Sequence, residues 1–207
     1  MRRAWRHVWQ EALPPAPCDI LDVGTGTGQV ALLLAELGHH VTGTDLSQGM
    51  LELARTKARG MTPPPTFLTD DAIEPDFAPS SFDAVTARYL LWTLHTPDLA
   101  LQNWRRLLRP GGRLVVVDST WFPHGVHSPE ATSEAPSAFQ RSYAPSVVER
   151  LPLAEAATIA DTVELIEAAG YRDLRLTPLH TIEALDRAQQ DDLEHTVRTQ
   201  YSITART

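Results

Sequence analysis

The sequence predicts an α/β fold, in which a doubly wound, mostly parallel sheet has helices on both faces. Two observations lead to this prediction. Short β-rich runs alternate with helix-period stretches, and the first run ends in a glycine-rich turn that opens a helix. At 207 residues with 43% hydrophobic side chains, the chain can bury a core, and we expect one domain over residues 1–207.

Seven β-rich runs are the expected strands: Asp19–Val23, His40–Thr44, Thr66–Leu68, Phe82–Ala87, Arg113–Asp118, Tyr171–Leu179 and Val197–Ala205. Four helix-period stretches lie between them: Gln29–Leu37, Gln48–Arg59, Asp98–Leu108 and Ala154–Ala169. Their boundaries have local causes. Ser47 is a good N-cap, Pro97 can open a helix, the Arg-Pro-Gly-Gly run at 109–112 is expected to stop one before a strand, and Gly170 suits a helix C-terminus.

Two segments depart from this alternation. Residues 1–18 are expected to form one short amphipathic helix, with Trp5, Val8, Trp9 and Leu13 on its apolar side. Residues 119–153 combine prolines with scattered aromatic side chains, and such a long interruption inside a domain is usually functional. We therefore expect a partly helical flap there.

Composition excludes several classes of function. The formal net charge of −8 argues against a nucleic-acid partner, because phosphate binding depends on clustered basic residues. Apolar runs are too short to span a membrane, and no signal peptide is apparent. Cys18 is the one cysteine, so no internal disulfide can form, and no Cys/His spacing fits a metal site. A cytoplasmic setting is expected.

The strongest local signal is the run Ile20–Gly28, in which a buried strand leads into three alternating glycines and then a helix. Glycines allow a sharp turn and close approach of a ligand to the backbone, and the helix N-terminus presents unpaired N–H groups. Asp45 ends the second strand, where a carboxylate can accept hydrogen bonds from both ribose hydroxyls. Spacing alone allows a dinucleotide or another adenosine compound.

The glycine register favours the second ligand class. The dinucleotide fingerprint requires glycine at position 29, which is Gln29 here. Asp22 directly precedes the turn and would repel a pyrophosphate, whereas it suits a cationic amino group. S-adenosylmethionine carries adenine, ribose, an α-ammonium and a sulfonium, and it has no phosphate.

Five motifs extend this pattern: LDVGTGTG at 21–28, VTGTDLSQGML at 41–51, TDDAIE at 69–74, SFDAVTARYLLWTL at 81–94 and LLRPGGRLVVVD at 107–118. In these motifs and their order the chain resembles the class I S-adenosylmethionine-dependent methyltransferases that act on small molecules. The resemblance implies a Rossmann-like sheet of seven strands with an antiparallel C-terminal strand. It also implies S-adenosylmethionine as the cofactor.

The resemblance implies a role for each matching residue. Gly24, Thr25, Gly26 and Gly28 would form the turn around the methionine half, with Asp22 reaching its ammonium and Asp45 binding the ribose. Leu46 and Met50 would flank the adenine, although Met50 could also be a core residue of its helix. Asp71 would accept from the adenine amine beside the Ala72 N–H, with Asp70 as the one-residue alternative. The backbone of Arg88 would face the methionine portion.

Methyl transfer from a sulfonium is an in-line displacement that needs neither a metal nor a covalent intermediate. The acceptor should lie beyond the fourth and fifth strands, beside Tyr89, Trp92, His95, Trp121, Phe122 and His124. Phe139 and Tyr143 of the flap could close over it. His95, His124, His127 and Tyr89 are the candidate bases, none of them singled out by a motif. Asp118 is expected to face a loop or cap a helix, with a place in the lining of the acceptor pocket as the alternative. His39 and His40 are expected on the surface.

Two departures from the family pattern concern the acceptor side. The N-terminal helix is short, so either the site is open or a second subunit in a homodimer covers it. Tyr89 stands where relatives often carry histidine. A non-catalytic S-adenosylmethionine-binding module and a nicotinamide oxidoreductase are the alternative functions, and the acceptor and its methylated atom (oxygen, nitrogen or carbon) stay open.

Overall fold

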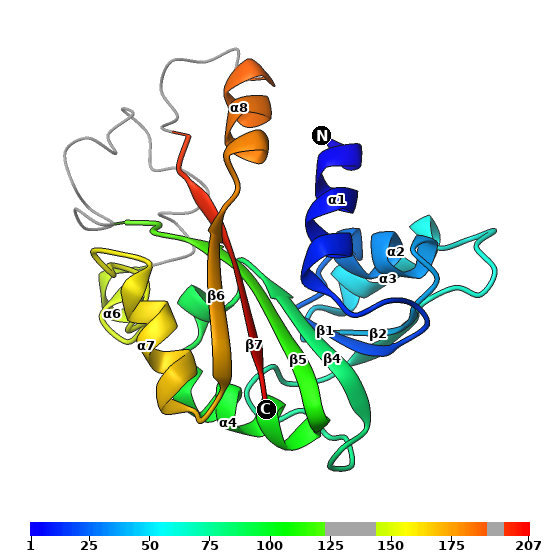
Figure 1. The fold of residues 1–207 in the computed structure, drawn as a ribbon, viewed down its shortest axis with the longest axis horizontal. Helices are drawn as coiled ribbons and strands as arrows, with labels where there is room; N and C mark the ends of the chain where they lie inside the picture. The colour runs from blue at the N-terminus through cyan, green and yellow to red at the C-terminus, as the bar shows by residue number, and fades with distance from the viewer. Residues whose placement is uncertain (123–143, 190–196) are drawn as a thin grey trace.

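The computed structural model describes residues 1–122, 144–189 and 197–207, and its seven strands form one sheet in the order β3-β2-β1-β4-β5-β7-β6 (Figure 1). The strands are β1 Asp19–Val23, β2 His40–Asp45, β3 Thr66–Thr69, β4 Phe82–Arg88, β5 Leu108–Ser119, β6 Arg172–Pro178 and β7 Gln200–Arg206. Strands β1 to β5 pair in parallel, whereas β7 runs antiparallel to both β5 and β6. The predicted doubly wound sheet with an antiparallel C-terminal strand is confirmed.

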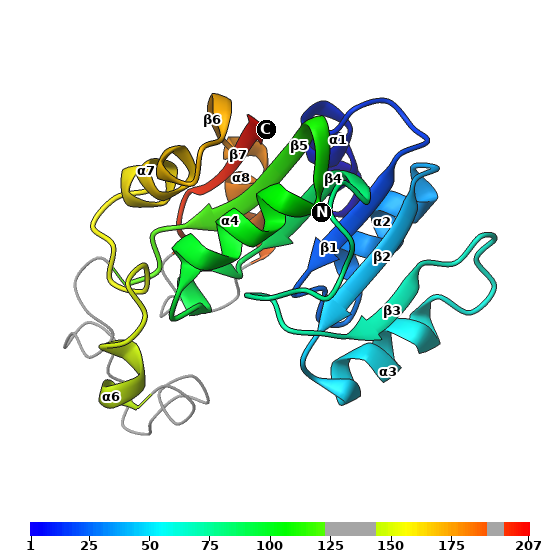
Figure 2. The same ribbon diagram turned by 90° about the horizontal axis from the view of Figure 1, so that it is seen from below.

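Helices cover both faces of this sheet (Figure 2). They are α1 Arg2–Ala12, α2 Gln29–Glu36, α3 Gln48–Lys57, the short 3-10 helix η1 Leu91–Thr93, α4 Pro97–Leu107, α6 Pro145–Val148, α7 Ala160–Ala168 and α8 His180–Gln189. One apolar core lies under α4 and α7 and includes Trp104 and Ile166, both fully buried. A second core lies under α1, α2, α3 and α8 and includes Trp9 and Leu34.

The strand register brings the carboxyl ends of the central strands to a common level. Val23 of β1 pairs with Thr44 of β2 and with Ala87 of β4, and Ala87 in turn pairs with Val116 of β5. Ligands of such sheets bind beyond the carboxyl ends of the strands, at the point where the strand order reverses. In this sheet that point lies between β1 and β4. The glycine turn that follows β1 therefore lies beside the ends of β2 and β4.

Several predicted boundaries have the expected local cause. The Ser47 hydroxyl accepts a hydrogen bond from the Met50 N–H (3.4 Å) at the start of α3, and Pro97 occupies the first turn of α4. Gly170, with φ of 89°, follows the end of α7. The N-terminal helix is also present, and it buries Trp9 and Ala12.

Most predicted boundaries lie within three residues of those observed, and two starts, those of α7 and β5, differ by five residues or more. The helix predicted from Ala154 begins only at Ala160, because reciprocal hydrogen bonds fix its start: the Thr158 hydroxyl accepts from the Ala160 N–H, and the Asp161 carboxylate accepts from the Thr158 N–H. The Arg-Pro-Gly-Gly run belongs to β5 rather than preceding it. Its pairing with β4 skips from Leu108 to Arg113, so the run forms an irregularity within the strand.

Within the described residues, no helix has the length and apolar character needed to span a bilayer.

Candidate functional site

The glycine turn has the backbone geometry that the sequence suggests. Gly24, Gly26 and Gly28 have φ values of 64°, 54° and 77°, in the left-handed region that disfavours other residues. A Cβ on Gly24 would lie 2.7 Å from Leu90, and one on Gly28 would lie 2.9 Å from Ala54. Gly26 instead faces open space, because no atom of the described residues lies within 4 Å of its Cβ position. The middle of the turn is therefore open to a ligand.

Beneath the turn, Asp22 is fully paired with neutral partners. Its side chain is 1% exposed, and its two oxygens accept hydrogen bonds from the hydroxyls of Thr25 (2.6 Å) and Thr86 (2.8 Å). Burial raises the pKa of Asp22 to about 6, and the two hydroxyls and nearby Arg88 oppose that rise. At neutral pH the carboxylate is therefore mostly ionised, which makes the floor of the turn negative.

Asp45 connects the end of β2 to the glycine turn. Its Oδ2 accepts from the Gly26 N–H (2.8 Å) and its Oδ1 from the Ser47 N–H (2.9 Å). The Thr25 N–H donates to the Thr44 carbonyl (2.8 Å), which holds the turn against β2. Each oxygen of Asp45 can accept a further hydrogen bond, because a carboxylate oxygen offers two lone pairs. Paired ribose hydroxyls would match this arrangement.

Two large apolar side chains lie exposed directly after Asp45. Leu46 is 69% exposed and Met50 is 45% exposed. Met50 is therefore not a core residue of α3, which instead buries Leu51 and Ala54. Apolar side chains exposed beside a polar cluster are typical of a surface that a flat ligand covers.

The two candidate acids after β3 differ in their hydrogen bonding. Asp70 uses both oxygens to shape its own loop, accepting from the N–H groups of Asp71 (2.9 Å) and Asp76 (3.1 Å). Asp71 is exposed, and among the described residues it accepts only from the Ile73 N–H (2.7 Å), through Oδ1. Its Oδ2 is thus available to a ligand. Ala72, the neighbouring candidate, is half-buried and its carbonyl accepts from the Trp104 indole N–H.

Arg88, at the end of β4, lies between two aromatic rings. Its guanidinium carbon is 4.9 Å from the ring centre of Trp5 on α1 and 5.0 Å from that of Tyr89. It also donates to the side chain of Gln29, the first residue of α2 (2.7 Å). Cation–π contacts of this kind stabilise by about 0.5–1 kcal/mol at exposed sites. Arg88 thereby joins the N-terminal helix to the glycine turn.

An aromatic cluster follows the ends of β4 and β5. Trp121 is 5.1 Å from Tyr89 and 5.7 Å from Trp92 between ring centres, and Trp92 is 5.8 Å from Phe122. The buried side chains of Val148, Leu151 and Ala154 pack against Trp92 and Phe122. The described end of the predicted flap thus contacts the aromatic cluster formed by Tyr89, Trp92, Trp121 and Phe122.

The candidate bases are placed unequally. The Tyr89 hydroxyl donates to the side-chain carbonyl of Gln200, and burial raises the pKa of Tyr89 above its ordinary value, so this phenol stays protonated at neutral pH. His95 is exposed beyond η1. His124, His127, Phe139 and Tyr143 lie outside the described residues.

Sequence reasoning missed several partners that organise this edge. Thr86 and Gln29 had no role in the motifs, yet they bind Asp22 and Arg88, and Gln200 binds Tyr89 from a distant strand. Asp118 was expected to face a loop or cap a helix, with the acceptor pocket as the alternative; it is 1% exposed and accepts from the Trp121 indole N–H. One signal could have identified Thr86: it is a polar residue within the apolar strand β4, and a buried polar side chain needs a hydrogen-bond partner.

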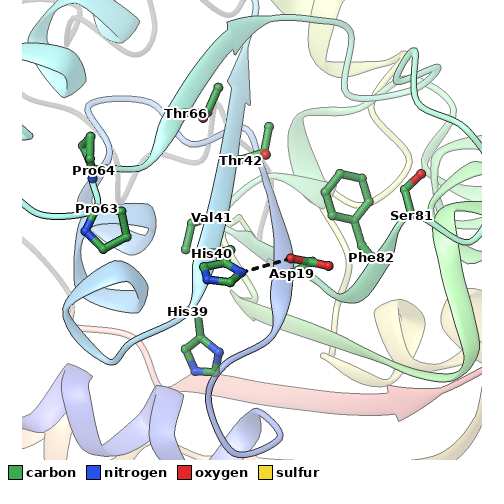
Figure 3. Close-up of a pocket in the computed structure, with 10 residues that line it drawn as sticks. All are labelled: Asp19, His39, His40, Val41, Thr42, Pro63, Pro64, Thr66, Ser81 and Phe82. Atoms are coloured by element: carbon green, nitrogen blue, oxygen red, sulfur yellow. Dashed lines mark hydrogen bonds and ion pairs between the residues drawn. The ribbon is translucent and has the colours of Figure 1, made fainter.

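A cavity lies at the opposite edge of the sheet, where the parallel strands begin (Figure 3). Asp19, His40, Thr66 and Phe82 line it from the first residues of β1, β2, β3 and β4, and His40 pairs with Asp19 (3.3 Å). The expectation that His39 lies on the surface is wrong: the residue is 5% exposed, and burial lowers its pKa. His40 is exposed as expected. This cavity is remote from the glycine turn.

The residues at the carboxyl edge fit a phosphate-free adenosine compound that carries a positive charge. The ionised carboxylate of Asp22 lies beneath the open glycine turn, and Asp45, whose oxygens can accept further hydrogen bonds, ends β2. The exposed side chains of Leu46 and Met50 follow, and Asp71 offers a further carboxylate oxygen. Among the described residues, no group of three His, Cys, Asp or Glu side chains could hold a metal ion.

Comparisons with known proteins point to the same ligand class. Residues 21–116 match the model of a family described as a methyltransferase domain. A demethylmenaquinone methyltransferase of Thermus thermophilus is 41% identical over 116 residues, covering 55% of this chain and 53% of that protein. The ubiquinone/menaquinone biosynthesis C-methyltransferase UbiE of a Ruegeria species is 33% identical over 129 residues, covering 60% and 52%. The chain thus spans about half the length of the curated relatives it matches.

Solved structures share the fold at lower identity. The [4+2]-cyclase SpnF has a TM-score of 0.70 at 22% identity, with 100% of this chain and 81% of that chain covered. Phosphoethanolamine N-methyltransferase 2 of Haemonchus contortus, in complex with S-adenosyl-L-methionine, has a TM-score of 0.69 at 19% identity, with 99% and 52% covered. Because one of these is a cyclase, the fold alone does not determine the reaction.

Proposed function

We propose that the chain is a class I S-adenosylmethionine-dependent methyltransferase of the small-molecule type, and that it transfers a methyl group from S-adenosylmethionine to a small aromatic acceptor. The observation that carries this proposal is the paired, ionised carboxylate of Asp22 beneath an open glycine turn. It would repel a pyrophosphate and attract the donor's ammonium, so it favours this donor over a nicotinamide dinucleotide.

The chain's own residues would hold the donor along the edge from β1 to β3. Asp45 would accept from the ribose hydroxyls with the lone pairs that the Gly26 and Ser47 N–H groups leave available. Leu46 and Met50 would be covered by the adenine, and the Oδ2 atom of Asp71 would accept from its amine. The nearby cation of Arg88 lowers the pKa of Asp22, which helps to keep that carboxylate ionised.

When bound, S-adenosylmethionine supplies a methyl group on a cationic sulfur, so the protein need only align the acceptor and exclude water. The aromatic cluster of Tyr89, Trp92, Trp121 and Phe122 provides half-buried apolar rings beside the ends of β4 and β5. Pockets of this composition favour flat, apolar ligands. An aromatic acceptor is therefore the class that the site supports.

The names of the relatives narrow the class. The relatives are demethylmenaquinone methyltransferases and a C-methyltransferase of quinone biosynthesis. We accordingly take a reduced quinone, an aromatic ring that carries hydroxyl groups, as the acceptor to be tested first. The cytoplasmic setting and a homodimer that covers the N-terminal side stay predictions.

The test is an assay of the purified chain with methyl-labelled S-adenosylmethionine and dithionite-reduced demethylmenaquinone. We expect a quinone product that is one methyl group heavier, formed together with S-adenosylhomocysteine. The Asp45→Ala variant, which lacks the proposed ribose ligand, should lose activity at low donor concentration. A chain that binds S-adenosylhomocysteine but yields no methylated product would contradict the proposed acceptor and favour a non-catalytic binding module.

A further inference from the structure

Asp22 and Asp118 are the two buried carboxylates in the described part of the chain, and their hydrogen bonding differs. Both oxygens of Asp22 accept from threonine hydroxyls. The Oδ1 atom of Asp118 accepts from the indole N–H of Trp121 (2.6 Å) and from the Ser119 N–H (2.9 Å). Its Oδ2 atom is buried and accepts no hydrogen bond of normal geometry from the described residues, although the backbone N–H of Trp92 lies close enough to lower the pKa of this carboxyl.

An unpaired buried oxygen is costly, since desolvation without a compensating hydrogen bond destabilises a folded chain. Such exceptions in native structures call for an explanation in function or strain. Threonine hydroxyls donate to both oxygens of Asp22, and one such hydroxyl beside Asp118 would satisfy its Oδ2 atom in the same way. The open position at Oδ2 is what a hydrogen-bond donor on a bound molecule would fill.

The strand register places Asp118 where the acceptor must lie. Arg88 pairs with Val117, so Asp118 stands one residue beyond the end of β4, next to Tyr89. The strands β1 and β5 lie on either side of β4, and neighbouring strands are about 4.8 Å apart. The carboxylate is therefore roughly 10 Å across the edge from the glycine turn, a separation that leaves room for the methyl group and a ring between them.

The surroundings of Asp118 are aromatic on the side of the proposed acceptor. Trp121 holds Oδ1 by its indole N–H, and the same ring contacts Tyr89 and Trp92. Ligand sites lined by apolar and aromatic side chains commonly contain a few polar groups that fix the orientation of the ligand. A carboxylate within an aromatic cluster can orient a flat ligand in this way.

We propose that Asp118 is the catalytic base of the reaction, and that its Oδ2 atom accepts the hydrogen bond and then the proton of an acceptor hydroxyl. This inference rests on the proposed function. The proton moves from the hydroxyl to Oδ2, and the electron pair of that O–H bond, delocalised over the ring, forms the bond to the methyl carbon. The carbon–sulfur bond breaks and its pair stays on sulfur. After attack by a ring carbon, that carbon releases its hydrogen to water as a proton, and Asp118 returns its proton to the oxygen.

The ionisation of Asp118 suits this role. Burial raises its pKa to about 7, while the hydrogen bonds from Trp121 and Ser119 and the nearby backbone N–H of Trp92 oppose that rise. Around it, the titratable and charged groups on the packed elements are Arg88, Tyr89, His95, Asp186 of α8 and Tyr201 of β7, which pairs with Asp118. The phenol of Tyr89 has a raised pKa and keeps its proton throughout this pH range.

The first test compares wild type with Asp118→Asn in the reduced demethylmenaquinone assay. The amide retains an oxygen for Trp121 and Ser119 and has nearly the same shape, so the fold should be kept. We expect kcat to fall about 100-fold or more, with the dissociation constant of S-adenosylhomocysteine unchanged. The matched control is Asp83→Asn, at the opposite end of β4, which should leave kcat unaffected.

The second test follows pH. In wild type, log kcat should rise through about pH 7 and then level off, and Trp121→Phe should move this rise to higher pH because it removes a hydrogen bond that lowers the pKa of Asp118. The ionisation of Asp118 can also be followed without catalysis, by NMR of the Trp121 indole N–H that donates to it. The chemical shift of this N–H should change with pH in wild type but not in Asp118→Asn.

The outcomes separate the two proposals. An active wild type with an Asp118→Asn variant of equal kcat and equal pH profile would overturn the role of Asp118 and leave the proposed function intact. A wild type that binds S-adenosylhomocysteine but does not methylate the reduced quinone would overturn both. Loss of activity in Asp118→Asn together with loss of the Trp121 titration would support the role.

Discussion

The carboxylate of Asp22 on β1 accepts a hydrogen bond from the hydroxyl of Thr86 on the neighbouring strand β4, at 2.8 Å, and both side chains are buried. This bond ties the floor of the glycine turn to the strand that ends in Arg88. It also means that the negative charge beneath the turn depends on a residue to which the sequence analysis assigned no role. Substitutions test this bond and five further positions of the same edge: Asp45, Asp70, Asp71, Trp92 and Asp118.

Thr86→Val removes that hydroxyl while preserving shape, which leaves one oxygen of Asp22 buried without its partner. We expect a loss of about 1–3 kcal/mol in the free energy of unfolding. The measurement is urea denaturation at pH 7, with Thr66→Val at an exposed position of β3 as the matched control. Equal stability of the two variants would contradict the stabilising role assigned to this bond.

Asp45→Ala should weaken binding of S-adenosylhomocysteine by about 1–3 kcal/mol, because it removes the carboxylate proposed to bind the ribose hydroxyls. Isothermal titration calorimetry gives the affinity directly. Asp83→Ala also removes a strand aspartate, yet from the far end of β4, and should bind as wild type does. Unchanged affinity in Asp45→Ala would refute the ribose assignment.

Asp71→Asn and Asp70→Asn should change different properties, the first the affinity for the donor and the second the stability of the fold. Asp71 has an oxygen available to the adenine amine, so its replacement should reduce donor affinity several-fold with little change in stability. Asp70 accepts two backbone hydrogen bonds within its loop, so its replacement should mainly lower stability, by about 1 kcal/mol. Calorimetry measures the donor affinity of both variants, and urea denaturation measures their stability. Loss of donor affinity in Asp70→Asn but not in Asp71→Asn would favour Asp70 as the adenine ligand.

The pKa of Asp118 also has a consequence for stability. Its folded value of about 7 lies above the ordinary 3.8, so the folded chain binds the proton more tightly than the unfolded chain. This contribution to stability is fully present below about pH 4 and is lost as pH rises through about 7. Asp118→Asn lacks it, so between pH 5 and pH 8 the variant should gain about 2–3 kcal/mol relative to wild type. Parallel pH dependences in urea denaturation would show that Asp118 titrates normally.

Trp92→Ala should impair use of the acceptor and spare the donor. The ring contacts Trp121 and Phe122 in the aromatic cluster, far along the edge from Asp45. We expect KM for the reduced quinone to rise about tenfold or more, with the S-adenosylhomocysteine affinity within twofold of wild type. A loss of donor affinity with an unchanged acceptor KM would place the acceptor elsewhere.

Local sequence patterns were sufficient for the sheet and for the conformation of the glycine turn. The strand Asp19–Val23 was predicted with its observed bounds, because a buried apolar run leads directly into glycines that only a tight turn requires. Ser47 and Gly170 likewise act through their own neighbours in sequence. Such signals are short-range and can be read from a single chain.

The rest depends on contacts between distant segments. Nothing local indicates that Trp5 stacks on Arg88, that Gln200 binds Tyr89, or that Asp118 is buried under Trp121. The start of α7 was misplaced for a different reason: the alanines before Thr158 continue the helical pattern, and the hydrogen bonds between Thr158 and its neighbours end it. A Thr-x-x-Asp pattern was present at this position and is a known helix-start signal.

The central claim is that the crevice above Asp22 accepts a phosphate-free adenosine with a positive charge. A crystal structure of the chain grown with S-adenosylhomocysteine and NAD in equal excess tests it most directly. We predict S-adenosylhomocysteine over the glycine turn, with its ribose on Asp45 and its adenine against Leu46 and Met50. NAD in that crevice, or the crevice filled by the protein's own side chains, would contradict the account.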